Sequence, residues 1–271
     1  MTTIGIEFVM DDRLLEILAC KPDLITDFPE WMLPPSTIHE MRETENVAVV
    51  EIAGRDSIAA VLRACKLRTI RAIVPTIAYT GTEYGNWAIT FEKIHILKDR
   101  LQKDNITVFD PVVIGSPKFW WKLCGRYTTH FTKKYGFYSH CVGCHFYFHA
   151  VRIPLAKKLN CRLIIGGERE SHNGKLKVNQ IKTSLDAYQS FLKKFGIELF
   201  LPIRYVKSGL EIESILNMPW NEGDQQLECV LSKNYLEADG SVSFYEEAII
   251  KYFEEFAFQT AEETIRKYLS I

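Results

Sequence analysis

The densest group of potential metal ligands in the sequence is the run His140-Cys141-Val142-Gly143-Cys144-His145. A Cys-x-x-Cys pair that enters a helix can bring two sulfurs onto one metal ion or cluster, and the amide groups at the helix start favour thiolate. The pair is only half of a site, because structural zinc takes four ligands and iron–sulfur clusters three or four. The remaining ligands must lie elsewhere, and the candidates are Cys124, Cys229, Cys161, His140, His145 and His149.

Other interpretations of these residues stay open. A lone Cys-x-x-Cys is a redox pair or half of a zinc site about as often as a set of cluster ligands. His145 and His149 share one face of a helix, where they could hold zinc or line an active cleft. No export signal accompanies the odd number of 7 Cys, so a disulfide framework is not expected. Cys20, Cys65 and Cys161 are expected to be structural thiols in apolar surroundings.

A second candidate site is the turn Ala53-Gly54-Arg55-Asp56-Ser57, between a β-branched run and a helical run. Unpaired amide groups and the positive end of the helix dipole make such a turn suitable for a phosphate. Gly54 allows close backbone approach, Ser57 offers a hydroxyl and Arg55 a charge. An ordinary turn with a capping Asp56 has the same pattern, so that alternative has equal weight.

Strand and helix patterns alternate along the chain and must position both sites. Strands are expected at 46–52, 70–79, 106–114, 162–165 and 198–205, and helices at 57–65, 87–103, 144–159, 182–195 and 242–268. This alternation predicts an α/β fold with an open parallel five-stranded sheet and helices on both faces. We expect an N-terminal cap over 1–45, a nucleotide-binding domain over 46–219 and a C-terminal loop and helix appendage over 220–271.

Composition and charge point to a globular protein with an anionic ligand. With 47% hydrophobic and 25% charged residues, the 271-residue chain is not disordered. Residues 111–167 contain nine Lys and Arg but no Asp or Glu. Within 118–138, cations alternate with aromatic rings, a pattern that suits unpaired RNA bases and phosphates. A helical lid with buried rings and solvated lysines explains the same stretch equally well.

The turn resembles the motif of the PP-loop ATP pyrophosphatase superfamily (adenine nucleotide alpha hydrolase-like), Ser-Gly-Gly-x-Asp-Ser after the first strand. Gly54, Asp56 and Ser57 match it, whereas Ile52 and Ala53 stand where Ser and Gly belong. The resemblance implies a HUP-like sheet and an ATP/Mg²⁺ site at Ala53, Gly54, Arg55, Asp56 and Ser57, with Asp56 catalytic. The departures leave nucleotide binding in place and put efficient ATP cleavage in question.

The iron–sulfur-dependent tRNA thiolation enzymes of that superfamily similarly carry a Cys-x-x-Cys and one late Cys. The match falls on Cys141, Cys144 and Cys229, and implies a 4Fe–4S cluster, with Cys229 also catalytic; zinc is the alternative. The zinc-ribbon cysteines of the best-known members are absent from this sequence. The family's second nucleotide loop corresponds to Gly167, Glu168 and Arg169, which would close over the phosphates and their Mg²⁺; a surface turn is the alternative there.

These features together predict an ATP-binding enzyme that adenylates a substrate and transfers sulfur, with RNA as the expected partner. Two alternatives remain: a PP-loop amidotransferase or ligase with structural zinc, and a non-catalytic nucleotide- or RNA-binding module. No membrane span and no secretory signal are recognised, so a cytoplasmic location is expected. A homodimer is compatible with the sequence.

Overall fold

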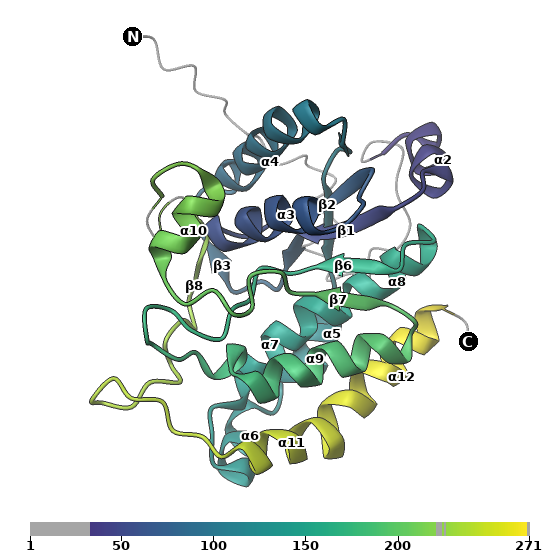
Figure 1. Ribbon diagram of the computed structural model, residues 1–271. Coiled ribbons are helices and arrows are strands. Elements are labelled where there is room, and N and C mark those ends of the chain that lie inside the picture. Colours follow the sequence, from purple (N-terminus) through teal and green to yellow (C-terminus); the bar gives the residue numbers. More distant parts are fainter. Residues whose placement is uncertain (1–32, 221–223, 225, 270–271) are drawn as a thin grey trace.

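The computed structural model describes residues 33–220, 224 and 226–269 (Figure 1). Its centre is a parallel sheet in the order β4-β2-β1-β6-β7, with β5 also paired to β2. The sheet strands are β1 (Val47–Glu51), β2 (Ala72–Tyr79), β4 (Thr107–Val108), β5 (Val112–Gly115), β6 (Leu163–Ile165) and β7 (Glu198–Phe200). They fall on the five runs predicted as strands, and the predicted α/β class is confirmed.

The sheet has six strands where the sequence predicted five, because the third predicted strand is interrupted. β4 pairs with the beginning of β2, and β5 pairs with its end. Pro111 lies between the two halves and has no amide hydrogen to donate to a neighbouring strand. Both halves lie on the same edge of β2, so the sheet still has five strand positions.

Helices precede, connect and follow these strands. They are α2 (Pro35–Glu43), α3 (Arg55–Leu67), α4 (Ala88–Leu101), α5 (Pro117–Trp120), α6 (Thr128–Tyr135), α7 (Ser139–Ala150), α8 (Arg152–Lys158), α9 (Lys182–Lys194), α10 (Gly209–Leu216), α11 (Glu246–Tyr252) and α12 (Phe258–Leu269). Shorter helical turns are η1 (Gln102–Asp104), η2 (Trp121–Gly125), η3 (Val178–Gln180) and η4 (Phe253–Ala257), and a separate antiparallel pair is formed by β3 (Glu83–Tyr84) and β8 (Glu228–Cys229).

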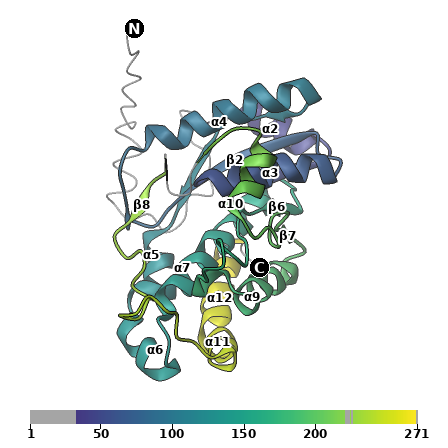
Figure 2. The same cartoon turned by 60° about the vertical axis from the view of Figure 1, so that its left-hand side comes forward.

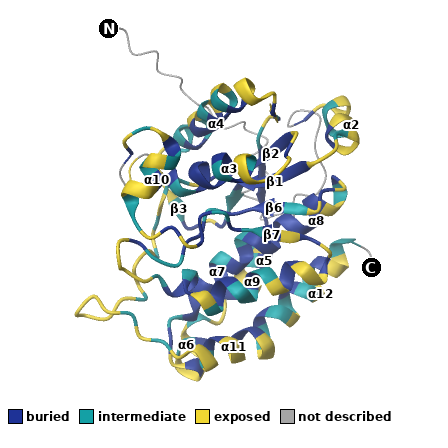
Figure 3. Cartoon of the chain, viewed as in Figure 1, coloured by how far each residue is buried: buried dark blue, intermediate teal, exposed yellow. Residues whose placement is uncertain are grey.

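Each face of the sheet packs against its own layer of helices. Alternate residues of β1 point to opposite faces, so Val47 and Val49 belong to one apolar cluster while Ala48 and Val50 belong to the other. Figure 1 shows α3, α4 and α10 on one side of the sheet and α5, α7, α8, α9 and α12 on the other. The buried central layer and exposed outer helix faces are visible in Figure 3. The predicted coverage of both faces is thus confirmed.

The C-terminal helices share the main core. Ile249, Tyr252 and Phe253 are buried in the same apolar cluster as Val47 and Val49 of β1. Of the predicted N-terminal cap, residues 1–32 and with them Cys20 lie outside the described part, and the three-part division of the chain stays a prediction. No helix among the described residues has the length and apolar character needed to cross a membrane.

The order of the strands creates a switch point between β1 and β6. The chain runs outward from β1 through β2 to β4 and β5, then returns on the other side of β1 to form β6 and β7. Connections after β1 and β6 therefore leave in opposite directions, which opens a crevice at the carboxyl ends of these two strands. The two predicted nucleotide loops follow these two strands.

We expect Lys93→Met to stabilise the protein at neutral pH. The Lys93 side chain on α4 is 1% exposed, and burial lowers its pKa to about 8. Between pH 8 and the usual value near 10.5, the unfolded chain binds the extra proton, so stability rises with pH there. Removing the charge should add on the order of 1 kcal/mol at pH 7 and less at pH 10, measured by urea unfolding.

The exposed Lys103 provides the control, since Lys103→Met removes a cation that solvent already hydrates. An equal gain for Lys93→Met at pH 7 and pH 10 would rule out the burial of charge as the cause.

Candidate functional site

The turn after β1 forms the start of helix α3. Gly54 is the N-cap in an extended conformation, with φ −135° and ψ −162°. The Ser57 hydroxyl accepts a hydrogen bond from the Ala53 amide at 3.0 Å and donates one to the Gly54 carbonyl at 2.7 Å. The predicted turn is therefore ordered by its own serine, with the helix start facing the crevice.

Asp56 ties this turn to the loop after β6. Its carboxylate accepts a hydrogen bond from Arg55 Nε at 2.9 Å and another from Arg169 Nε at 2.7 Å. Arg169 is fully buried, and it also donates to the Ser171 carbonyl. In this geometry Arg169 positions the two loops against each other, and it does not line the cavity at the turn.

The pair Gly166-Gly167 allows two close approaches that side chains would prevent. A Cβ atom on Gly167 would lie 2.7 Å from both the amide nitrogen and Cα of Ser57. A Cβ atom on Gly166 would lie 2.6 Å from Glu168 Oε2 and 3.1 Å from His149 Cε1. One glycine thus brings the loop against α3, and the other leaves room for the Glu168 carboxylate.

A cavity of about 190 Å³ lies at the turn. Every residue from Ala53 to Ser57 lines it, together with Gly167 and Glu168 of the second loop. Seven of the residues that the sequence predicted at the nucleotide site thus line one cavity, and their role in binding a nucleotide stays a prediction. The remaining lining residues are Glu51, His145, His172, Lys177, Gln180 and Gln226.

A second cavity, of about 310 Å³, contains the cysteines. Cys141, Cys144 and Cys229 all line it, although 85 or more positions separate Cys229 from the other two along the chain. The first two lie in the opening turns of α7, which begins at Ser139. The structure thus brings together the three cysteines that the sequence singled out as metal ligands.

Cys229 reaches this cavity because β8 pairs with β3. Cys229 is opposite Glu83 in this antiparallel pair, and the Val230 amide donates to the Thr82 carbonyl at 3.0 Å. The Cys229 sulfur lies 3.4 Å from the Thr82 hydroxyl and accepts from the Leu231 amide at 3.4 Å. Figure 2 shows β8 on the opposite side of the molecule from α9 and α12.

Cys124 adds a fourth thiol behind the first three. It is 3% exposed, and burial together with the neighbouring Cys144 raises its pKa well above the usual value. Burial, followed by the proximity of Cys144 and Cys229, likewise raises the pKa of Cys141. Without a bound cation such thiols stay protonated, whereas a bound cation would favour their thiolate forms and release the protons.

The spacing of the potential ligand atoms bears on the two metal alternatives, a zinc ion and an iron–sulfur cluster. A single zinc ion with bonds of about 2.3 Å holds its sulfurs roughly 4 Å apart. In the described part of the chain, the one group of three potential ligands with all donor atoms within 4.8 Å is Glu51, His149 and Glu168. The sulfurs of Cys141, Cys144 and Cys229 therefore do not all lie within 4.8 Å of one another, and the choice between a cluster and zinc stays a prediction.

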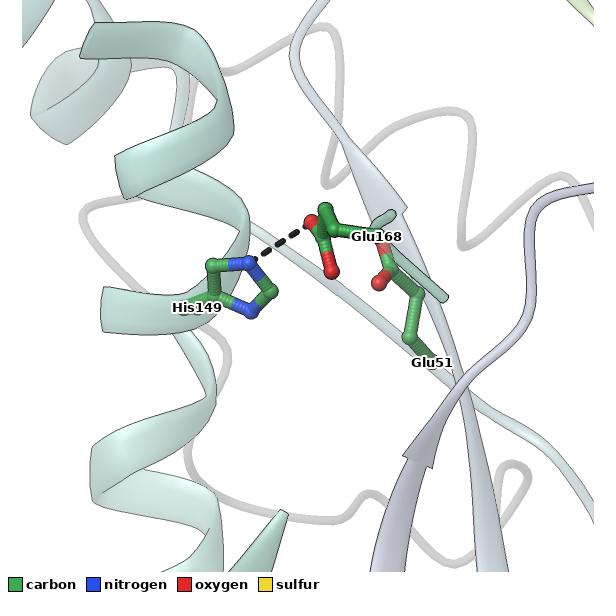
Figure 4. A group of neighbouring side chains, drawn as sticks. All are labelled: Glu51, His149 and Glu168. Carbon is green, nitrogen blue, oxygen red and sulfur yellow. Dashed lines mark ion pairs between the residues drawn. The ribbon is translucent and has the colours of Figure 1, made fainter. Parts of the chain in front are cut away.

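The Glu51, His149 and Glu168 side chains point toward one another (Figure 4), and Glu51 lines both cavities. His149 Nε2 is 2.7 Å from Glu168 Oε1, and His145 Nδ1 is 3.6 Å from the same oxygen. Burial raises the pKa of Glu168, but the two histidines outweigh burial and hold that pKa well below its usual range. Fully buried Arg152 donates to the Thr76 hydroxyl at 2.7 Å and interacts favourably with both glutamates.

The basic aromatic stretch is divided between core and surface. Its buried rings are Phe119, Phe131, Tyr135 and Phe137. Trp121 is 48% exposed and Tyr127 36% exposed, and the Arg126 guanidinium lies 5.0 Å from the centre of each ring. Part of the stretch therefore packs in the core, and a smaller part forms an exposed patch of Trp121, Arg126 and Tyr127.

Sequence reasoning missed several residues around the cavities. Lys177 and Gln180 line both cavities, but they lie in the irregular connection between β6 and α9. Glu51 also lines both and is 8% exposed, at the end of a strand otherwise composed of Val and Ala. A glutamate ending a buried apolar strand was the available signal, because a buried carboxylate requires a partner.

The protein is of the α/β class, with an open parallel sheet, a cavity at the switch point and a cysteine-lined cavity next to it. No family model matches the chain. It is 37% identical over 251 residues to the uncharacterized protein MJ0009 of Methanocaldococcus jannaschii, with 90% of each chain covered. The chain belongs to the same family as MJ0009.

Solved structures show more distant similarity. A predicted subunit of tRNA methyltransferase from Methanocaldococcus jannaschii is 14% identical, with 79% of this chain and 90% of that chain covered and a TM-score of 0.40. The U34-tRNA thiolase NcsA from Methanococcus maripaludis with its [4Fe-4S] cluster is 13% identical, with 87% and 76% covered and a TM-score of 0.38. Neither similarity is close enough to carry an argument about this chain.

We expect Gly167→Ala to destabilise the protein far more than Gly54→Ala. The new methyl group at Gly167 would collide with the backbone of α3, which cannot move without disturbing the core, so the cost is about 2–3 kcal/mol. At Gly54 it would meet only the side chain of exposed Gln226, so the cost is about 1 kcal/mol or less. Urea unfolding of both variants measures the difference, and equal costs would contradict the tight loop contact.

Proposed function

We propose that this protein is an ATP-binding, PP-loop-type enzyme that adenylates a substrate and transfers sulfur to RNA through an iron–sulfur site on Cys141, Cys144 and Cys229. The supporting observation is that the two cavities adjoin. They share the lining residues Glu51, Ala53, His145, Lys177, Gln180 and Gln226. A substrate activated in one cavity would therefore be next to the sulfurs of the other.

The cavity at the turn suits a polyphosphate. The start of α3 presents amide groups and the positive end of its dipole, and Gly54 leaves the backbone accessible from the cavity. Lys177 adds a cation, and Mg²⁺ would accompany the phosphates of ATP. Asp56 and Ser57 hold the turn in shape, while Arg169 positions the second loop through Asp56.

Adenylation and sulfur transfer are connected by their leaving groups. A substrate oxygen attacks the α-phosphate of ATP, the bond to the β-phosphate breaks, and pyrophosphate leaves. The adenylated carbon then forms a bond to sulfur, its bond to oxygen breaks, and AMP leaves with that oxygen. A cluster on Cys141, Cys144 and Cys229 would leave one iron open to carry the sulfur, and the three thiolates would hold the cluster in the cavity that adjoins the turn.

The exposed patch of Trp121, Arg126 and Tyr127 supports an RNA substrate. Exposed rings stack on unpaired bases, and an arginine between them contacts phosphate. The patch lies near the sulfurs, because Trp121 begins the helical turn η2 that also contains buried Cys124. The adjacent Trp120 donates from Nε1 to the Cys144 sulfur at 3.3 Å.

We expect protein purified without oxygen to be brown and to contain iron and sulfide. Cys141→Ala and Cys229→Ala should each lose most of the visible absorbance and iron, because each removes one of three ligands. Cys161→Ala is the control, since its buried thiol donates hydrogen bonds to the carbonyls of Val47 and Leu163 and does not line the cavity. Colourless protein with stoichiometric zinc would instead support the amidotransferase or ligase alternative.

We expect Lys177→Ala to weaken ATP binding about tenfold, because it removes a cation that lines both cavities. Lys175→Ala is the matched control, since this exposed lysine lies two residues away and lines neither cavity. Calorimetric titration with a non-hydrolysable ATP analogue measures the affinities. Equal affinity for the two variants would place the nucleotide elsewhere.

A separate assay tests the alternative of a non-catalytic nucleotide- or RNA-binding module. Release of AMP and pyrophosphate from ATP in the presence of bulk tRNA would exclude that alternative.

A further inference from the structure

Glu51 and His149 have no role in the chemistry proposed above, and Glu168, which the sequence predicts beside the phosphates and their Mg²⁺, is buried with them. All three side chains are nearly inaccessible, at 8%, 0% and 3% exposure, and one donor atom of each lies within 4.8 Å of the others. Figure 4 shows the His149 ring and both carboxylates pointing toward one another from α7, β1 and the loop after β6. Three distant segments thus direct an imidazole and two carboxylates to one point.

Two polar atoms of this group have no hydrogen bond. His149 Nδ1 and Glu168 Oε2 lack a hydrogen-bond partner within the described residues. The 2.7 Å contact between His149 Nε2 and Glu168 Oε1 is an ion-pair contact that engages only one carboxylate oxygen. Unsatisfied polar atoms in the interior cost roughly 1–3 kcal/mol each, so their convergence on one point indicates a missing partner.

Two of the three side chains are carboxylates, which are common ligands of divalent cations. Glu51 and Glu168 lie in the interior, where the buried guanidinium of Arg152 interacts favourably with both of them and His149 interacts favourably with Glu168. Partly exposed His145, 3.6 Å from Glu168, and buried Tyr188, whose ring lies 5.3 Å from that of His149, are further titratable side chains near the group. A Cβ atom at Gly166 would lie 2.6 Å from Glu168 Oε2, so the glycine keeps this carboxylate oxygen uncrowded.

We propose that Glu51, His149 and Glu168 bind a divalent first-row transition metal ion such as Mn²⁺ or Fe²⁺, separate from the cysteine site. One imidazole and two carboxylates suit such an ion, whereas Mg²⁺ takes oxygen ligands and a cluster takes sulfur. Neighbouring ligands on bonds of about 2.1 Å lie roughly 3 Å apart, close to the 2.7 Å between His149 and Glu168.

The place of this ion would connect it to the two cavities. Glu51 lines both, and Glu168 lines the cavity at the turn. The coordination positions that the protein leaves open would therefore face the phosphate end of a nucleotide. This last step rests on the proposed function, but binding of the ion itself requires neither ATP nor iron.

The test is a titration of the full chain with Mn²⁺ in the absence of nucleotide, followed by the electron paramagnetic resonance signal of free Mn²⁺. The wild-type protein should bind one ion. Glu168→Gln and His149→Gln should each weaken binding by at least about tenfold, since even outer partners of a metal contribute that much. Glu170→Gln, the same substitution two residues along the loop, should bind as the wild type does.

Two further measurements keep the result independent of folding and of the cysteines. Saturating Mn²⁺ should raise the unfolding temperature of the wild type and of Glu170→Gln, and leave that of Glu168→Gln unchanged. Cys141→Ala should still bind one Mn²⁺, so a failure of the proposed sulfur chemistry does not affect this test. Absence of binding in the wild type, or equal binding in Glu168→Gln, overturns the proposal and leaves a simple ion pair. Loss of binding in Cys141→Ala overturns it as well, because the ion then belongs to the sulfurs.

Discussion

The close contact between the loops that follow β1 and β6 is the constraint on which the site depends. Parallel strands that lie side by side end at the same edge, and the reversal of chain direction there opens a crevice. The crevice can be narrow only because Gly167 lets backbone touch backbone at Ser57. The partly buried ion pair between Asp56 and Arg169 then fixes the two loops relative to each other. The contact therefore sets the distance between the two loops that form much of the wall of the cavity at the turn.

Local sequence signals were sufficient for the sheet and for the turn. The run that includes β1 is β-branched and apolar because it is buried on both faces, and the Gly-x-Asp-Ser pattern follows it directly. The interruption of the third strand was also present in the sequence, as Pro111. The grouping of Cys141, Cys144 and Cys229 in one cavity came from a resemblance, because no local pattern links residues so far apart. Lys177 had no signal at all, since an irregular connection carries no periodicity.

The basic aromatic stretch, residues 118–138, shows what local sequence signals cannot predict. Its rings and lysines recur at spacings that suit either a nucleic-acid surface or a packed helix, and the choice depends on what packs against each face. Tyr135 and Phe131 face the C-terminal helices, and Lys134 pairs with Glu255 at 2.7 Å. Glu255 from the C-terminal part of the chain thus neutralises one cation of a segment that contains no acidic residue. This long-range compensation is invisible until the fold is known.

The cysteines of the second cavity are supported by elements of very different rigidity. Two belong to α7, which packs through Val142 and Phe146 into the main core, and opening it would require much of the molecule to unfold. Cys229 belongs to a strand of two residues at the molecular surface, paired only with another of the same length. Local opening of so short a pair requires little free energy compared with global unfolding. Cys229 can therefore separate from Cys141 and Cys144 and return while the main sheet stays folded. The three sulfurs come together only when β8 pairs with β3, and this step is reversible.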